Sequence, residues 1–327
     1  MKKNRAALDE LQLTHRRRAR DYYKRSHRRL TSILVWVALI LLFGVMGFSA
    51  VRVGRDVYSC VSSQQTSEDL RETYYADVPD DADAATPTDI TVPKDALEPP
   101  AAEQGALVLP AKPYPGSANP VMSGRFLRLR RENADIIAWL TIDGLLDEAV
   151  VQRDNSYYLR RDYRGYHNVN GSIFVDEGCS FRTRPYTVML YGHNMRSGAM
   201  FGALRHYDKP SFYRANPFIT FDTAYEDGRF VIFSVAMVSL QHYDAHYLNF
   251  AKLNSSTVPW REEAIEVLKK HSLYSPVIDV SAEDQILLLV TCIDDEDHER
   301  RVIAARRIRE GETEEALLHQ ISGSFPQ

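Results

Sequence analysis

Residues 286–292 read Ile-Leu-Leu-Leu-Val-Thr-Cys, which predicts a buried strand that ends at a cysteine. The polar segment Asp294-Asp295-Glu296-Asp297 follows, so Cys292 stands where the strand emerges into a loop. A strand end holds a side chain rigidly while leaving it accessible, which suits a nucleophile. Taken alone, the residue is read equally well as a core cysteine that closes a strand.

Short β-rich runs recur through the rest of the C-terminal 205 or so residues, with turn material between them. Many short strands at irregular spacing favour a barrel or sandwich over alternating strand–helix units. Two helices are predicted among them, over 126–140 and 259–271, and the second presents an apolar stripe suited to packing on a sheet. The predicted strands are 149–152, 171–175, 187–191, 218–221, 229–240, 285–291 and 302–308.

Two further polar residues stand at strand ends. His193 follows the predicted strand 187–191, and the pair Arg300-Arg301 opens the strand 302–308. A thiol, an imidazole and a guanidinium in such positions can act as nucleophile, acid/base and oxyanion stabiliser. A histidine in a loop is more often a loop residue without a catalytic role, so these residue types alone leave the reaction open.

The chain has three cysteines, too few for a disulfide framework. Cys60 and Cys179 are interpreted as incidental thiols, and a disulfide between them stays open. The acidic segment 294–297 with His298 lacks the ligand spacing of a metal site. We predict no metal and no cofactor.

The residues around the candidate site resemble those of class B sortases. Leu289-Val290-Thr291-Cys292, followed nine residues later by Arg301 and a β-run, is similar to the sortase cysteine–arginine signature. The block 191–202 around His193 is similar to the class B catalytic-histidine block. Three more blocks match in family order, at 133–144, at 150–159 and at 171–176.

This resemblance implies a mainly β fold, a sortase-type barrel of eight strands with added N-terminal helices and one helix before the cysteine strand. It implies a cysteine transpeptidase in which Cys292 attacks a backbone carbonyl of a C-terminal sorting motif, His193 protonates the leaving amine and Arg301 stabilises the oxyanion. It also places Asn155 and Leu159 in the substrate groove. The implied partners are surface proteins that carry the sorting motif and an amine acceptor, either a Gram-positive cell-wall (peptidoglycan) precursor or a pilin lysine.

Some positions depart from the family pattern. Leu288 replaces the first threonine of the cysteine motif, Ile293 replaces an acidic residue, and Glu148-Ala149 replaces a Tyr-Pro pair. None is the nucleophile, acid or arginine, so these departures bear on motif specificity. Arg300 is a rival for the arginine role, and Arg301 is preferred because apolar strand residues follow it directly.

Two other function classes remain open. A cysteine hydrolase would use the same nucleophile and histidine, with water as the acceptor, and would act as a thiol protease. A non-catalytic, membrane-tethered scaffold would not need Cys292, His193 or Arg301. Product analysis with and without an added amine separates the first alternative from a transpeptidase.

Residues 30–51 form a run of 22 residues without a charged side chain, between Arg29 and Arg52. At about 1.5 Å per residue this run spans a hydrocarbon core of about 30 Å. Its length and its poor cleavage pattern favour an uncleaved anchor over a signal peptide. Residues 1–29 carry 11 Lys/Arg against 3 Asp/Glu, which predicts a cytoplasmic N-terminus in a single-pass type II protein of the cell membrane. Beside a membrane span this basic tract indicates topology rather than nucleic-acid binding.

Residues 61–120 hold 9 of the 15 prolines, and 11 acidic residues against 3 basic ones. Such a composition buries too little apolar surface to offset the cost of ordering, which predicts a flexible stalk. The predicted organisation is therefore a tail at 1–29, an anchor at 30–51, a Pro-rich acidic stalk at 52–120 and an extracellular catalytic domain at 121–327.

Overall fold

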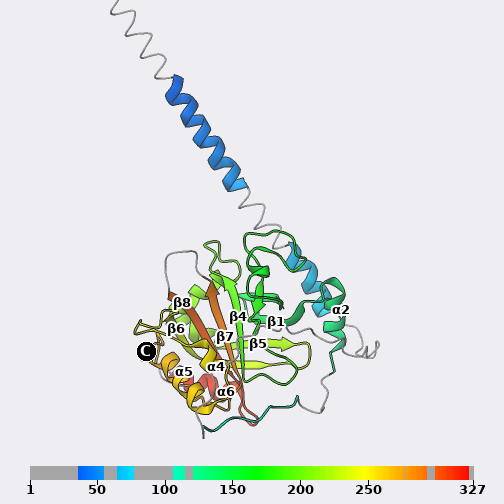
Figure 1. The fold of residues 1–327 in the computed structure, drawn as a ribbon, viewed down its shortest axis with the longest axis vertical. Helices are drawn as coiled ribbons and strands as arrows, with labels where there is room; N and C mark the ends of the chain where they lie inside the picture. The colour runs from blue at the N-terminus through cyan, green and yellow to red at the C-terminus, as the bar shows by residue number, and fades with distance from the viewer. Residues whose placement is uncertain are drawn as a thin grey trace, which may run out of the picture. The chain divides into compact units, whose positions relative to one another are not determined.

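The computed structural model describes residues 36–54, 65–76, 106–114, 121–275, 277–292 and 299–323 (Figure 1). The chain divides into two compact units, Met1–Tyr58 and Ser59–Gln327. In the first unit the helix Trp36–Gly54, 19 residues with a mean hydropathy of 2.1, is long and apolar enough to cross a membrane. It overlaps most of the predicted span, which agrees with a single-pass anchor. The predicted basic tail and residues 30–35 lie outside the described residues.

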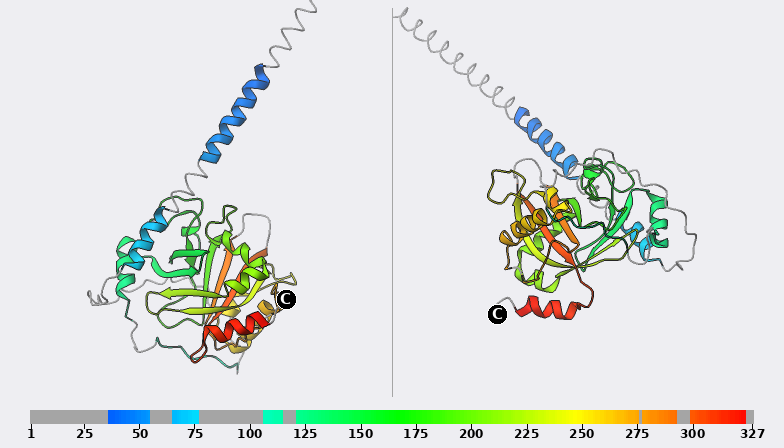
Figure 2. Two further views of the ribbon diagram at one scale, coloured as in Figure 1. Left: turned by 180° about the vertical axis from the view of Figure 1, so that it is seen from behind. Right: turned by 60° about the horizontal axis from the view of Figure 1, so that its bottom comes forward.

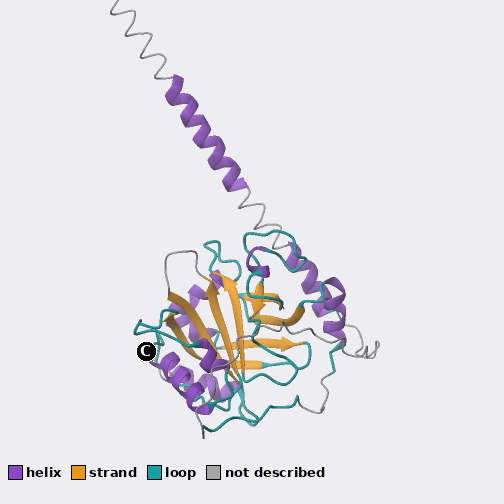
Figure 3. Ribbon diagram, viewed as in Figure 1, coloured by secondary structure: helices purple, strands orange, loops and turns teal. Residues whose placement is uncertain are grey.

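The second unit is built on a closed barrel of eight strands, which confirms the predicted fold class (Figure 3). The strands follow the order β1-β2-β3-β4-β7-β8-β6-β5 around the barrel. Most neighbours are antiparallel, whereas β2–β3 and β4–β7 are parallel. The strands are β1 (Ile136–Ile142), β2 (Leu146–Val151), β3 (Ile173–Val175), β4 (Thr187–His193), β5 (Phe218–Thr223), β6 (Arg229–Ser239), β7 (Ile286–Cys292) and β8 (Glu299–Arg307).

Short helices cover the barrel and close one of its ends. Helices α4 and α5 lie outside it, as Figure 2 shows, and α5 is the helix predicted before the cysteine strand. The segments are α2 (Gly124–Glu132), η1 (Tyr157–Arg160), η2 (Phe201–Asp208), α3 (Pro210–Ala215), α4 (Phe250–Asn254), α5 (Val258–Lys270) and α6 (Glu314–Gly323).

Two side-chain contacts show which face of the strands points outward. Thr187 Oγ1 of β4 donates to the Leu253 carbonyl of α4 (2.8 Å), and Ser234 Oγ of β6 donates to the Leu268 carbonyl of α5 (2.6 Å). Side chains alternate between the two faces of a strand. On β4, every second residue counted from Thr187 therefore points to the outside of the barrel. The residues between them point into its interior.

The predicted helix 126–140 is wrong beyond residue 132. The structure ends α2 at Glu132 and begins β1 at Ile136. Asn133 is extended (φ −153°), and its side-chain oxygen accepts from the Asp135 backbone N–H (2.8 Å). Six of the seven residues of β1 are buried, so its apolar run has no alternation to distinguish it from a helix.

Two segments of the expected stalk pack on the catalytic unit. Residues 65–75 form a helix whose Leu70 and Tyr74 are 2% and 4% exposed. Tyr74 stacks on Trp139 of β1, with ring centroids 4.2 Å apart, and donates to Asp222 of β5 (2.6 Å). Farther along, Val108 makes an isolated β-bridge with Thr257. The structured unit thus extends to sequence that composition alone assigns to a linker.

Candidate active site

The ends of β4 and β7 bring two predicted site residues together. These parallel strands align seven residue pairs without a shift, from Thr187 opposite Ile286 to His193 opposite Cys292. Adjacent strands lie about 5 Å apart. The predicted nucleophile and acid are therefore backbone neighbours at one end of the sheet, on strands that lie far apart in the sequence.

The imidazole of His193 is oriented by a backbone carbonyl. His193 Nε2 lies 2.6 Å from the carbonyl oxygen of Leu159, in η1. A carbonyl can only accept a hydrogen bond, so Nε2 carries the proton in this contact. Nδ1 is then the ring nitrogen that can gain or lose a proton. The predicted residue Leu159 thus meets the site through its main chain, and its side chain is half-buried.

Gly171 allows this carbonyl to lie where it does. Its φ is +61°, and a Cβ at this position would come within 2.5 Å of the Leu159 oxygen and 2.7 Å of the Tyr158 oxygen. Any side chain at residue 171 would therefore displace the backbone that holds His193.

Arg301 forms a bidentate ion pair. Its Nε and Nη2 donate to Oδ1 and Oδ2 of Asp208 at 3.1 and 2.8 Å, and its side chain is 14% exposed. The backbone N–H of Arg301 also donates to Thr291 Oγ1 (3.1 Å), on the strand that carries Cys292. A planar guanidinium held at both ends of its fork has little freedom to turn toward another acceptor.

Strand register places the two arginines on opposite faces of β8. Val302 pairs with Val290 of β7. Because side chains alternate, Arg300 shares the face of Val302, and position 292 shares the face of Val290. Arg301 lies on the other face, toward the barrel interior. Arg300, the rival for the arginine role, therefore lies on the face of Val290.

Arg300 also has unused hydrogen-bonding capacity. Its Nη1 is buried and has no hydrogen-bond partner among the described residues. A buried guanidinium nitrogen without an acceptor is energetically costly.

The amide of Asn155 is engaged within the protein. Its Nδ2 donates to Asp176 Oδ2 (3.0 Å), and its Oδ1 accepts from the Glu177 backbone N–H (2.9 Å). Asn155 thereby ties the segment before η1 to the segment after β3. In this arrangement its side chain shapes the loops near His193 rather than offering a free amide.

Cys179 is a buried, free thiol. It is 3% exposed and donates from Sγ to the Thr187 carbonyl (3.1 Å). Burial raises the pKa of this thiol to about 12, so it stays protonated and poorly nucleophilic. Cys60, the other half of the disulfide that the sequence left open, lies outside the described residues.

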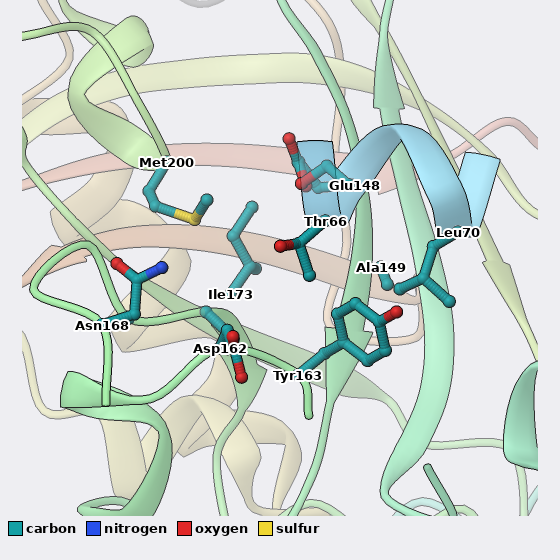
Figure 4. A pocket seen from close by; sticks show the side chains of 12 residues that line it. Thr66, Leu70, Glu148, Ala149, Asp162, Tyr163, Asn168, Ile173 and Met200 are labelled. Carbon is teal, nitrogen blue, oxygen red and sulfur yellow. The ribbon is translucent and has the colours of Figure 1, made fainter. Parts of the chain in front are cut away.

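A cavity of about 30 Å³ lies between the 65–75 helix and the residues Asn168 and Met200 (Figure 4). Thr66 and Leu70 line it from the helix, and Asn168 and Met200 from the opposite side. Met200 has a φ of 50° and bridges to Asn194, the residue after His193. The 65–75 helix, the first described segment after the membrane anchor, thus lines the same cavity as Met200, which bridges to the residue after His193.

Sequence reasoning did not identify Asp208 as the partner of Arg301, or the Leu159 carbonyl as the partner of His193. A carbonyl has no residue signature, and Asp208 ends a 3-10 segment whose role depends on which strand it meets. Within the described ranges, no cluster of three His, Cys, Asp or Glu residues could hold a metal ion.

Comparison with known proteins identifies relatives over more than half of the chain, although no family model matches it. A curated relative from Listeria monocytogenes, named Sortase B, is 25% identical over 274 residues, 83% of this chain and 95% of the relative. Another from Staphylococcus aureus, also named Sortase B, is 28% identical over 189 residues, 57% of this chain and 75% of the relative.

Solved structures are similar in fold as well as in sequence. A Bacillus anthracis protein described as similar to sortase B is 29% identical with a TM-score of 0.51, over 61% of this chain and 88% of that chain. A Staphylococcus aureus sortase B–substrate complex is 28% identical with a TM-score of 0.50, over 57% and 86%. The chain is therefore similar to sortase B proteins in both sequence and fold.

Proposed function

This chain is a class B sortase, a cysteine transpeptidase, and from that premise we propose that Cys292 cleaves a C-terminal sorting motif and transfers its acyl group to an amine. The single observation that carries the proposal is the register pair His193–Cys292 at the ends of two parallel strands. With Cys292 as the proposed nucleophile and His193 as the proposed acid/base, this pairing supports acyl transfer through a thioester.

The proposed reaction has two halves. The Cys292 thiolate attacks the carbonyl carbon of the motif, which forms the C–S bond and moves the carbonyl π electrons onto oxygen. When this oxyanion collapses, the C–N bond breaks and His193 Nδ1–H gives its proton to the leaving amine. The acceptor amine then attacks the thioester, its proton passes to His193, and the thiolate leaves.

An arginine at the start of β8 donates hydrogen bonds to the oxyanion in this mechanism. The sequence favours Arg301 for that role, whereas the register and the unpartnered Nη1 favour Arg300. We assign the role to Arg301, as the family resemblance implies, and keep Arg300 as the alternative. Losing one oxyanion donor typically lowers kcat by about 10²–10³-fold. We expect that loss from Arg301→Ala and activity near the wild-type level from Arg300→Ala, whereas the reverse result would make Arg300 the donor.

We propose that the sorting motif lies along the loops that contain Asn155 and Leu159. The Leu159 carbonyl contacts His193 and the Leu159 side chain is half-buried, so this side chain is available to contact an apolar residue of the motif. Leu159→Ala should then raise KM for apolar motif variants more than for polar ones. An equal change for every peptide would argue against a groove at this position.

The nucleophile is tested with a library of C-terminal sorting-motif peptides and hydroxylamine, which converts a thioacyl-enzyme into a hydroxamate. Cys292→Ala should form no hydroxamate, while Cys60→Ala and Cys179→Ala should form it at the wild-type rate. Hydroxamate formation by the Cys292→Ala variant would refute the mechanism. Products formed with water alone, at a rate that an added amine does not change, would identify a hydrolase instead.

We also propose that the anchor places the catalytic domain outside the cell, where its acceptor is a peptidoglycan-precursor amine or a pilin lysine. The helix Trp36–Gly54 and the basic residues before it support this orientation. Protease added to intact cells should digest the Pro-rich sequence at 77–105. Protection of that segment until the membrane is permeabilised would contradict the orientation.

A further inference from the structure

The carboxylate of Asp208 occupies only one edge of the Arg301 guanidinium. Nε and Nη2 donate to Oδ1 and Oδ2 of Asp208 at 3.1 and 2.8 Å. Two parallel hydrogen bonds of this kind fix the direction of the guanidinium plane as well as its distance. Nη1 carries further N–H donors and has no hydrogen-bond partner among the described residues. The ion pair therefore leaves an oriented donor group on Arg301.

Asp208 belongs to the 3-10 segment that packs beneath the histidine. It is the last residue of η2, and η2 contacts both β4 and β7. At the start of η2, the Phe201 ring packs against Gly192, where a Cβ would come within 2.8 Å of the ring. The segment that ends at Asp208 is thus fixed against the strand that carries His193.

The main chain of Arg301 is held by the strand that carries the nucleophile. Its backbone N–H donates to Thr291 Oγ1 at 3.1 Å, one residue before Cys292. The β7–β8 ladder reaches as far as Val290 opposite Val302, so this contact extends the link between the two strands beyond the ladder. The arginine is therefore fixed at its backbone, and Asp208 fixes the far end of its side chain.

These contacts explain how an arginine on the interior face of β8 can serve the site. Its side chain leaves the strand on the face opposite Val290, and the pair with Asp208 holds the guanidinium against η2. η2 in turn contacts the strands of both proposed catalytic partners. The Arg301 side chain is 14% exposed and that of Asp208 is 45% exposed, so Asp208 can be replaced without opening the core.

We propose that Asp208 is a positioning residue of the transpeptidase, which holds the Nε–Nη2 edge of Arg301 so that Nη1 donates to the oxyanion. The inference rests on the proposed function, because it takes Arg301 as the oxyanion donor. Without the carboxylate, the guanidinium is free to turn about the single bonds of its long side chain. A donor that must first be oriented stabilises the transition state less than one that is already in place.

The test measures kcat and KM of the full chain in detergent, with the peptide that the wild type cleaves best from the sorting-motif library and hydroxylamine as the acceptor. Asp208→Asn keeps the size of the side chain but removes its charge and one acceptor oxygen. It should lower kcat by about 10- to 100-fold, the size of loss that a misplaced catalytic group produces. KM should change by less than about threefold, because the oxyanion forms only in the transition state. Asp208→Glu keeps the carboxylate and should recover most of kcat.

A double-mutant cycle decides whether Asp208 acts through Arg301. Arg301→Ala alone should lower kcat by about 10²–10³-fold. Adding Asp208→Asn to that variant should lower kcat no further, because the group that Asp208 holds is already absent. A loss by the same factor in both backgrounds would show that Asp208 acts independently of Arg301 and would overturn the proposal.

A matched control is present elsewhere on the barrel. Glu314 is also 45% exposed and also forms a bidentate pair with a strand arginine, Arg229, at 2.8 and 3.1 Å. Glu314→Gln should leave kcat at the wild-type value, and a loss as large as that of Asp208→Asn would count against a specific role. Alkylation of Cys292 by iodoacetamide forms no oxyanion, so Asp208→Asn should react at the wild-type rate. Slower alkylation would place the defect at the thiol and overturn the proposal.

The remaining outcomes separate this inference from the proposed function. Wild-type kcat in Asp208→Asn, with Arg301→Ala impaired and Cys292→Ala inactive, would overturn this inference alone. Wild-type kcat in Arg301→Ala, with Cys292→Ala inactive, would overturn both this inference and the choice of oxyanion donor. Equal activity of Cys292→Ala and the wild type would overturn the proposed function itself.

Discussion

Replacing Tyr74 by alanine should destabilise the catalytic unit far more than a substitution in a flexible stalk could. The ring is 4% exposed and lies parallel to Trp139, 9° from coplanar, and its hydroxyl donates to the buried Asp222 (2.6 Å). Truncating a buried aromatic side chain costs about 3–5 kcal/mol. An Asp222 left with fewer donors adds about 1 kcal/mol or more.

The expected shift in melting temperature follows from that sum. A loss of about 4–6 kcal/mol lowers Tm by roughly 8–24 °C in a unit of this size. Tyr74→Phe keeps the stacked ring and removes only the hydroxyl, so it should cost about 1 kcal/mol. Tyr75 is 56% exposed, and Tyr75→Ala is expected to cost less than about 1 kcal/mol.

Near-ultraviolet circular dichroism during a thermal scan measures these shifts, because it follows the packing of Trp139 and its neighbours. The same ranking should appear in urea unfolding, where the midpoint falls without a change in slope. If Tyr74→Ala melts within 2 °C of the wild type, the 65–75 helix does not pack on β1 in solution. The stalk would then begin at residue 52, as the composition predicts.

Three further substitutions test other parts of the structure. In the wild type, we expect the unfolding free energy measured with urea to be lower at pH 8 than at pH 4. Glu148→Gln should remove the part of this decrease that Glu148 causes. Burial raises the folded-state pKa of this carboxyl, so its favourable contribution is complete below the unfolded pKa and is lost as pH rises through the folded one. Arg261→Met should lower the unfolding free energy by about 3 kcal/mol, because the buried guanidinium donates to Thr187 Oγ1 and four carbonyls. A smaller loss, measured by thermal unfolding, would contradict this. Gly171→Ala should cost about 1–3 kcal/mol and reduce hydroxamate formation, and an unaffected rate would show that the Leu159 carbonyl does not orient His193.

The barrel could largely be predicted from the sequence because most of its strands are short apolar runs bounded by turn residues. β1 was the exception. Residues 136–140 are buried on the barrel interior and also under the 65–75 helix, so their apolar run shows no period. The helix itself has a readable signal in Thr66, Leu70 and Tyr74, which lie four residues apart and are all buried. The acidic, proline-rich composition around it masked that stripe.

Candidate residues at strand ends followed from the sequence, because a polar residue that closes an apolar run is visible in one dimension. The family resemblance then singled out Cys292 and His193. Their adjacency came only from the parallel pairing of β4 with β7, which no local pattern contains. The choice between Arg300 and Arg301 depends on the parity of the β7–β8 register. A shift of one residue along a strand turns a side chain to the other face, and the hydrogen bonds between strands, rather than the residues themselves, set that register.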